Sequence, residues 1–171
     1  ILRKHGGALG LRSSFVIYDE GDQLSLMRDC LRAIGLSERA LKPRAVLSRI
    51  SRAKNDLLSP EEYALVANDL MEERTARLYR MYQERLEGFQ ALDFDDLLMG
   101  TVRLFERHPD VLAAYQDFWR YILVDEYQDT NHAQYRLIHL LANKHGNLCV
   151  VGDDDQSIYK WRGADLNNIL D

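Results

Sequence analysis

The sequence predicts an α/β protein in which a mainly helical region is followed by part of a parallel sheet. Apolar residues recur with helical spacing over most of residues 1–115. After residue 120 the pattern changes to short apolar runs that alternate with a helical segment, which is typical of a parallel sheet. The composition, 46% hydrophobic and 29% charged, is that of a folded chain and not of a disordered one.

Two helices are predicted in the first third of the chain. An apolar run at residues 15–18 ends in Asp19, which can cap a helix that Gly35 terminates. Pro43 fits the first turn of the next helix. Its polar face is basic, so we expect it to point to solvent or to phosphate. The basic residues of this segment are Lys42, Arg44, Arg49, Arg52 and Lys54.

The next helices are predicted from their start signals. Ser59 and Glu62 have the spacing of a capping box, and the helix they open is expected to run to about Glu87. Asp93 can cap a helix over residues 94–107, which Pro109 separates from a shorter one. Acidic residues in the first turn of a helix usually serve capping and dipole roles, so a metal cluster at this turn is the weaker alternative.

The sheet is predicted from two apolar runs. Residues 121–124 are read as a buried strand that ends in Asp125-Glu126, and residues 148–151 as a second buried strand that ends at Gly152. Asn131 can begin the helix between them. A two-stranded parallel unit is not stable alone, so we expect the chain to be a piece of a larger protein.

Charge and cysteine content exclude several classes. The net charge of −5 excludes binding of nucleic acid by bulk charge, so any contact must come from local patches. Residues 1–90 carry 15 basic and 13 acidic side chains, and residues 91–171 carry 7 and 14. We expect no membrane span and no signal peptide. Cys30 and Cys149 lie in apolar contexts, where buried, reduced thiols are expected.

The acidic pair Asp125-Glu126 is the sharpest candidate for chemistry. Ligands of open α/β sheets bind outside the carboxyl ends of the strands, where this pair is expected. An ATPase needs one carboxylate for Mg²⁺ and another that orients and deprotonates water. Gln156, after the second strand, is in a position to reach a terminal phosphate. The alternative is a strand end that merely turns into a capped loop.

Aromatic and basic residues alternate after the second strand. In an extended segment, Tyr159 and Trp161 would project to one side and Lys160 and Arg162 to the other. Rings that stack on bases beside cations form a platform for a single strand of nucleic acid. The alternative is a core tryptophan with a polar edge.

Together these motifs resemble superfamily 1 DNA helicases of the UvrD, PcrA and Rep type. Residues 123–131 (LVDEYQDTN) resemble motif II and residues 152–164 (GDDDQSIYKWRGA) resemble motif III. Similar stretches at residues 17–23, 53–55 and 92–98 extend the resemblance over essentially the whole chain. It implies a helical insertion subdomain over residues 1–115 and part of a RecA-like ATPase core over residues 116–171.

The resemblance also implies residue roles, with ATP and Mg²⁺ as cofactors. Asp125 would help to bind Mg²⁺, Glu126 would act as general base, and Gln156 would sense the γ-phosphate. Four residues would contact single-stranded DNA: Phe94, Tyr159, Trp161 and Arg162. The implied partners are single-stranded DNA, its junctions with duplex, and the rest of the helicase chain, in the cytoplasm on the nucleoid.

The sequence departs from this family in three respects, since it lacks the phosphate loop, the second RecA-like domain and the arginine finger that the family supplies from that domain. It contains no Gly-x-x-x-x-Gly-Lys-Ser/Thr phosphate loop, so we expect an internal fragment of an ATP-dependent DNA helicase that lacks ATPase activity by itself. The main alternative is a non-catalytic module that docks DNA or a partner through residues 42–54. A metal nuclease using Asp95, Asp125 and Asp154 is disfavoured because no lysine accompanies them in a nuclease-like arrangement.

Overall fold

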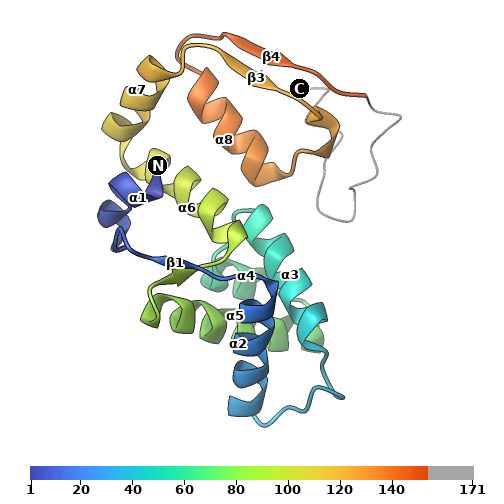
Figure 1. Ribbon diagram of the computed structural model, residues 1–171. Helices are drawn as coiled ribbons and strands as arrows, with labels where there is room; N and C mark the ends of the chain where they lie inside the picture. The colour runs from blue at the N-terminus through green and yellow to red at the C-terminus, as the bar shows by residue number, and fades with distance from the viewer. Residues whose placement is uncertain (154–171) are drawn as a thin grey trace.

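The computed structural model describes residues 1–153, which form eight helices, four short strands and two 3₁₀ turns (Figure 1). The helices are Leu2–His5 (α1), Glu20–Ala33 (α2), Pro43–Asn55 (α3), Pro60–Val66 (α4), Leu70–Gly88 (α5), Phe94–Arg107 (α6), Pro109–Phe118 (α7) and His132–Ala142 (α8). The strands are Val16–Ile17 (β1), Ala91–Leu92 (β2), Ile122–Val124 (β3) and Leu148–Val150 (β4), and the 3₁₀ turns are Gly6–Leu9 and Tyr127–Asp129. This confirms the predicted α/β fold class, a mainly helical region with parallel strands.

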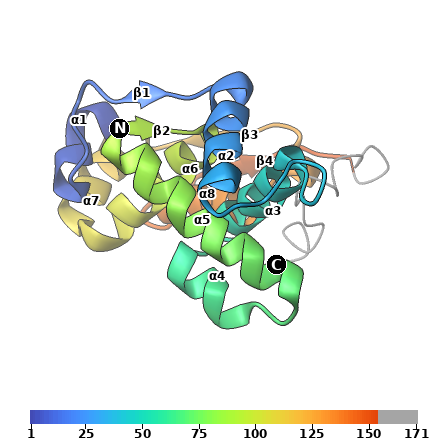
Figure 2. The ribbon, with the colours of Figure 1, turned by 90° about the horizontal axis from the view of Figure 1, so that it is seen from below.

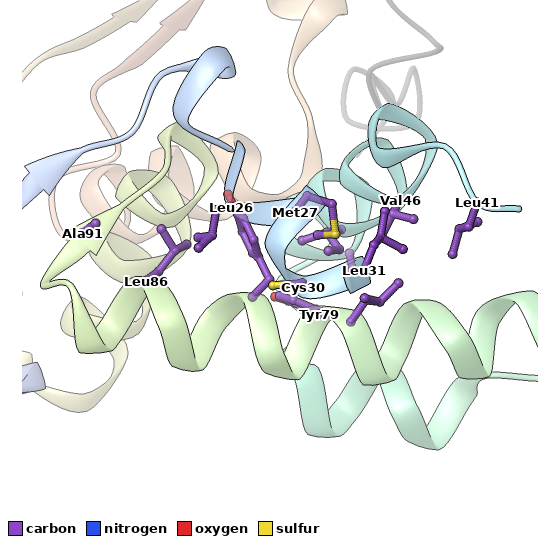
Figure 3. Close-up of a cluster of buried hydrophobic side chains, with 13 residues drawn as sticks. Leu26, Met27, Cys30, Leu31, Leu41, Val46, Tyr79, Leu86 and Ala91 are labelled. Carbon is purple, nitrogen blue, oxygen red and sulfur yellow. The ribbon is translucent and has the colours of Figure 1, made fainter. Parts of the chain in front are cut away.

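Helices α2, α3 and α5 pack around one apolar core (Figure 3). Met27 and Leu31 of α2 are fully enclosed in it. Val46 and Ile50 of α3 and the rings of α5 meet it from the other sides. The core side chains are Leu26, Met27, Cys30, Leu31, Leu41, Val46, Ile50, Ala53, Leu78, Tyr79, Tyr82, Leu86 and Ala91.

The helix expected over residues 59–87 is in fact two helices. The capping box at Ser59 is confirmed, because Ser59 Oγ accepts the Glu62 N–H at 3.1 Å and Glu62 Oε2 accepts the Ser59 N–H at 2.7 Å. Helix α4 nevertheless ends at Val66, and α5 begins after Asp69. The Asp69 side chain accepts the N–H of Glu72 at 2.7 Å, so Asp69 is the N-cap of a second helix, which runs in a new direction. Figure 2 shows α4 lying beside α5.

A parallel strand pair that the sequence analysis did not predict lies within the helical region. Residues 16–17 pair with residues 91–92, and Val16 donates its N–H to the carbonyl of Gln90 at 3.0 Å. The chain therefore leaves β1, builds α2 to α5 and returns beside its starting point (Figure 2).

The second parallel pair, β3 with β4, has α8 packed on one face (Figure 1). Both strands were expected to be buried, which is wrong for this chain: Leu123 is 79% exposed and Val150 is 43% exposed. Side chains alternate across the sheet, and Leu123 and Cys149 pair on the face away from α8. Cys149 is therefore exposed, against expectation, whereas Cys30 is buried as predicted.

Within the part of the chain that the structure describes, no helix is long and apolar enough to cross a membrane.

Candidate functional site

The acidic pair lies at the carboxyl end of β3, where the chain makes a strained turn. Glu126 adopts left-handed backbone angles, φ 52° and ψ 44°, which are uncommon for a residue with a side chain. Its N–H bonds Asp125 Oδ1 at 2.9 Å. Both carboxylates line a hollow of about 350 Å³ between the end of β3 and α8. The turn thus places both acidic residues at one concave site.

Backbone and side-chain hydrogen bonds hold this turn against the end of β4. Tyr127 donates its N–H to the carbonyl of Val151 at 2.9 Å, and Thr130 Oγ1 bonds the Tyr127 carbonyl at 2.7 Å. The fully buried Gln128 donates from Nε2 to Glu126 Oε2 at 2.7 Å. Its Oε1 accepts the backbone N–H of Asp153 at 3.0 Å. The conformation of the acidic turn is therefore fixed from the neighbouring strand.

A second, larger hollow lies beside the first. This groove of about 950 Å³ runs between α2, α3, the start of α6 and the start of α8. Phe94, which is 60% exposed, lines it together with Ser48 and Ser51 of α3. Asp129 and Gln134 line both hollows, so the groove and the acidic hollow share a wall.

The basic helix α3 forms one side of the groove, but not all of its charges face outward. Arg44 and Arg52 line the groove, and Arg44 also pairs with Glu20 at 3.1 Å. The expectation that Lys54 belongs to the solvent-facing or phosphate-facing surface is wrong, because Lys54 is only 1% exposed. It is directed into the protein because two carboxylates of the α6 cap receive its ammonium group.

Lys54 is the centre of a buried ionic cluster, which we call the lysine clamp and define as Lys54, Asp93, Asp96 and Tyr82. Nζ of Lys54 lies 2.7 Å from Asp93 Oδ2 and 2.7 Å from Asp96 Oδ1. The Tyr82 hydroxyl donates to Asp93 Oδ2 at 3.1 Å. Asp93 is the predicted cap of α6, and with Asp96 it forms a capping box with bonds of 2.9 and 3.1 Å. The clamp therefore fixes the helix start that carries Phe94 against α3.

Burial and pairing oppose each other in the clamp. Burial raises the pKa of Asp96 to about 6, and nearby Asp93 adds to this while Lys54 opposes it. Burial also acts to raise the pKa of Asp93, but the Lys54 ammonium and its hydrogen bonds leave that pKa below the usual value. Burial acts to lower the pKa of Lys54, and the two carboxylates reverse this and raise it. The lysine is therefore charged at neutral pH.

One side-chain hydrogen bond joins α3 to the loop that follows the acidic turn. Asn131 caps α8 by accepting the Gln134 N–H at 2.9 Å, and its Nδ2 donates to Asn55 Oδ1 at 2.9 Å. Asn55 lies one position after Lys54 and lines the groove. This hydrogen bond thus joins the helix that borders the groove, α3, to the start of α8, which borders the acidic hollow.

The predicted site residues fall into three groups. Asp125 and Glu126 lie together in the acidic hollow, and Phe94 lies in the adjacent groove. The remaining four, Gln156, Tyr159, Trp161 and Arg162, lie outside the described residues.

Sequence reasoning missed the roles of Lys54, Asn55 and Gln128. Gln128 lies inside the motif II stretch, but the period of the sequence gives no signal that its amide is buried. Lys54 and Asn55 follow the buried Ala53 at the end of an amphipathic helix, and only the fold brings Asp93 and Asn131 to them.

Comparison with known proteins identifies the family. The model of the UvrD/REP helicase N-terminal domain matches residues 1–171. The chain belongs to this family. Two relatives are 50% identical over 170 residues, the ATP-dependent DNA helicases PcrA of Staphylococcus epidermidis and Leuconostoc citreum. PcrA of Bacillus subtilis is 49% identical over the same length. In each case the match covers 99% of this chain but 23% of the relative, so this UvrD/REP segment spans about a quarter of those proteins.

Proposed function

We propose that the chain is an internal part of an ATP-dependent DNA helicase that couples Mg-ATP hydrolysis to movement on single-stranded DNA and to duplex unwinding. The observation that carries this proposal is the shared wall between a hollow with two carboxylates and a groove with an exposed ring and arginines. The family supports it, as do the relatives named ATP-dependent DNA helicases.

In this proposal the acidic hollow acts on ATP. Carboxylate oxygens are the preferred protein ligands of Mg²⁺, and Asp129 Oδ1, buried at the shared wall, has no hydrogen-bond partner within residues 1–153. Within residues 1–153 no three acidic, histidine or cysteine side chains form a metal site by themselves, so the phosphates of ATP would supply further ligands. Asp125 would hold the ion, which supplies charge neutralisation at the phosphates. Glu126 would take a proton from the attacking water, and Gln156 would sense the γ-phosphate.

The groove would receive single-stranded DNA. Phe94 offers an exposed ring for base stacking, and Arg44 and Arg52 offer cations for the backbone. Tyr159, Trp161 and Arg162 would extend this contact surface, as their match to motif III implies. We also propose that single-strand/duplex junctions are bound by the parent protein.

We propose a division near residue 115 between a helical insertion and a partial RecA-like core. The exposed sheet face around Leu123 supports a core that is completed by other parts of a longer chain. The isolated chain is proposed to lack ATPase activity. For the parent protein we propose a role in DNA repair or replication restart, 3′ to 5′ movement, and a cytoplasmic, nucleoid-associated location.

The first test replaces the proposed base in the full-length protein. Glu126→Gln should reduce ATP turnover by about 10²-fold or more while a non-hydrolysable ATP analogue binds with nearly unchanged affinity. Glu84→Gln, at an exposed position on α5, serves as control and should leave turnover unchanged. Wild-type turnover in Glu126→Gln would exclude the general-base role.

The second test concerns the proposed binding of single-stranded DNA in the protein groove, for which the chain offers a matched pair of phenylalanines. Phe94 and Phe89 are 60% and 62% exposed, but Phe94 lines the groove. Phe94→Ala, like Trp161→Ala, should weaken oligo(dT) binding by about 5- to 100-fold in fluorescence anisotropy, and Phe89→Ala should not. Equal affinities for the two phenylalanine variants would contradict a stacking role for Phe94.

A second candidate function is a non-catalytic docking module for DNA. It is favoured by the basic residues of α3, of which Arg44 and Arg52 line the groove. This alternative predicts that the isolated chain binds DNA in a salt-dependent way and that Arg49→Glu with Arg52→Glu abolishes binding. Absence of binding by the isolated chain at low salt would exclude it.

A further inference from the structure

We infer that Gln128 is a positioning residue that ties the proposed general base, Glu126, to the end of β4, and so to the segment carrying Gln156. The inference rests on the proposed function of Glu126. It adds a residue to which neither the motif resemblance nor the family match gives a role.

The geometry leaves the Gln128 amide one orientation. A carboxylate needs a donor and a backbone N–H needs an acceptor, so Nε2 must face Glu126 Oε2, at 2.7 Å, and Oε1 must face the Asp153 N–H, at 3.0 Å. The side chain is fully buried, so water cannot replace either bond without a change of structure. A single amide thus bridges the acidic turn and the neighbouring strand end.

Glycine at position 152 makes this bridge possible. A Cβ at Gly152 would lie 2.6 Å from Gln128 Oε1 and 3.3 Å from the backbone nitrogens of Tyr127 and Gln128. The first distance is shorter than any van der Waals contact, so a side chain here would push the amide out of place. The close approach of the two segments therefore depends on both residues.

The bridge also selects which oxygen of the base can act. Glu126 Oε2 accepts the amide N–H, which lowers the basicity of this oxygen relative to Oε1 and favours proton uptake at Oε1. The left-handed backbone of Glu126 gives its side chain no support from regular secondary structure. The orientation of the carboxylate then depends on Gln128.

The bridge ends three residues before Gln156 in the chain. A displacement of the β4 end therefore changes the hydrogen bond at Asp153 and, through the same amide, the carboxylate of Glu126. Gln128 thus makes hydrolysis depend on the segment that is proposed to contact DNA. Loss of the bridge should lower DNA-stimulated turnover more than nucleotide binding.

The experiment uses the full-length protein with Gln128→Ala, Gly152→Ala and the double variant. Each single change should reduce DNA-stimulated kcat by about tenfold or more, with the affinity for a non-hydrolysable ATP analogue within about twofold of wild type. The double variant should be close to Gln128→Ala, because the 2.6 Å clash of the new methyl group is with the amide that has been removed and only the 3.3 Å contacts with backbone nitrogens remain. Hydrogen exchange at the Asp153 amide should accelerate in Gln128→Ala.

Gln116→Ala is the matched control, since Gln116 is also buried and donates from Nε2 to the Leu140 carbonyl at 2.8 Å, away from the acidic turn. It should leave kcat unchanged. An unchanged kcat in folded Gln128→Ala, or an equal loss in Gln116→Ala, overturns the inference. If Gln128→Ala does not fold, Gly152→Ala decides by the same criteria. Retained turnover in Glu126→Gln would instead refute the proposed function. Loss of turnover in Glu126→Gln together with wild-type turnover in Gln128→Ala would refute this inference alone.

Discussion

Two regions of the molecule differ in which side chains they bury: the helical unit, made of α2, α3, α5 and α6, and the β3–β4 sheet. The helical unit encloses an ammonium group and two carboxylates in the lysine clamp. The sheet leaves Leu123 and Val150 in contact with solvent. Charge is stable in the lysine clamp because its ammonium group is paired with both carboxylates. Apolar surface remains on the sheet because α8 packs on one face, mainly against β3, and leaves Leu123 on the opposite face. In these two regions, whether a side chain is buried depends more on whether it has a partner to pair or pack with than on whether it is polar.

The largest expected change in stability comes from a substitution that breaks the lysine clamp. Lys54→Met should lower the free energy of unfolding by about 3–5 kcal/mol, because two buried carboxylates lose their counter-charge. Urea unfolding measures the change. Arg52→Met, at an exposed position on the same helix, should stay within about 0.5 kcal/mol of wild type. A small effect at Lys54 would mean that the carboxylates are neutral in the folded state.

Replacing one leucine in each region by alanine compares the contribution of the two regions to stability. Leu78→Ala, at a fully enclosed position in the helical core, should cost about 2–5 kcal/mol. Leu123→Ala, on the open face of the sheet, should change stability by about 0.5 kcal/mol or less. Similar losses in urea unfolding would show that the sheet face is covered in solution, for example by self-association.

The helical unit should also carry a pH dependence of stability. The folded-state pKa of Asp96 is about 6 and its ordinary value is 3.8, so the folded state binds more protons between these values. Stability from this group is therefore present below about pH 4 and is lost as pH rises to about 6, by roughly 2–3 kcal/mol. Asp96→Asn should flatten this part of the profile of unfolding free energy.

Asp56→Asn is the control for this profile, because Asp56 is exposed. It should keep the wild-type slope between pH 4 and 6. The same slope in Asp96→Asn would assign the pH dependence to another group.

The smallest expected effect concerns the contact between the two regions. Asn131→Ser keeps a capping oxygen for α8 but cannot reach Asn55, and it should cost about 1 kcal/mol. Asn143→Ser, at the exposed end of the same helix, controls for the substitution. Equal unfolding free energies for both variants would show that the Asn55 contact adds no net stability.

The same comparison explains how much the sequence could predict. Start signals act within one turn, so the caps at Asp19, Ser59, Asp93 and Asn131 were predictable and are confirmed. The break before Asp69 was missed because the apolar pattern continues across it. The acidic pair could be located at a strand end from local pattern alone.

Long-range partners could not be predicted in this way. The strand at residues 91–92 is two residues long and has no period of its own, and it forms because β1 lies beside it. Lys54 lies in a basic segment, and its burial depends on carboxylates 39 and 42 positions away in the chain. The buried amide of Gln128 likewise depends on Gly152, which only the pairing of β3 with β4 brings near.

The β1–β2 pair has a consequence for how this fold can vary. It holds the entrance and exit of the excursion over residues 18–90 side by side, by backbone hydrogen bonds that do not depend on what the excursion contains. The excursion can therefore vary in length between these anchoring points, provided that Lys54 and Tyr82 are kept to pair with Asp93 and Asp96. The architecture is modular in this sense, and laboratory grafts that exchange residues 18–90 between relatives can use the same two junctions.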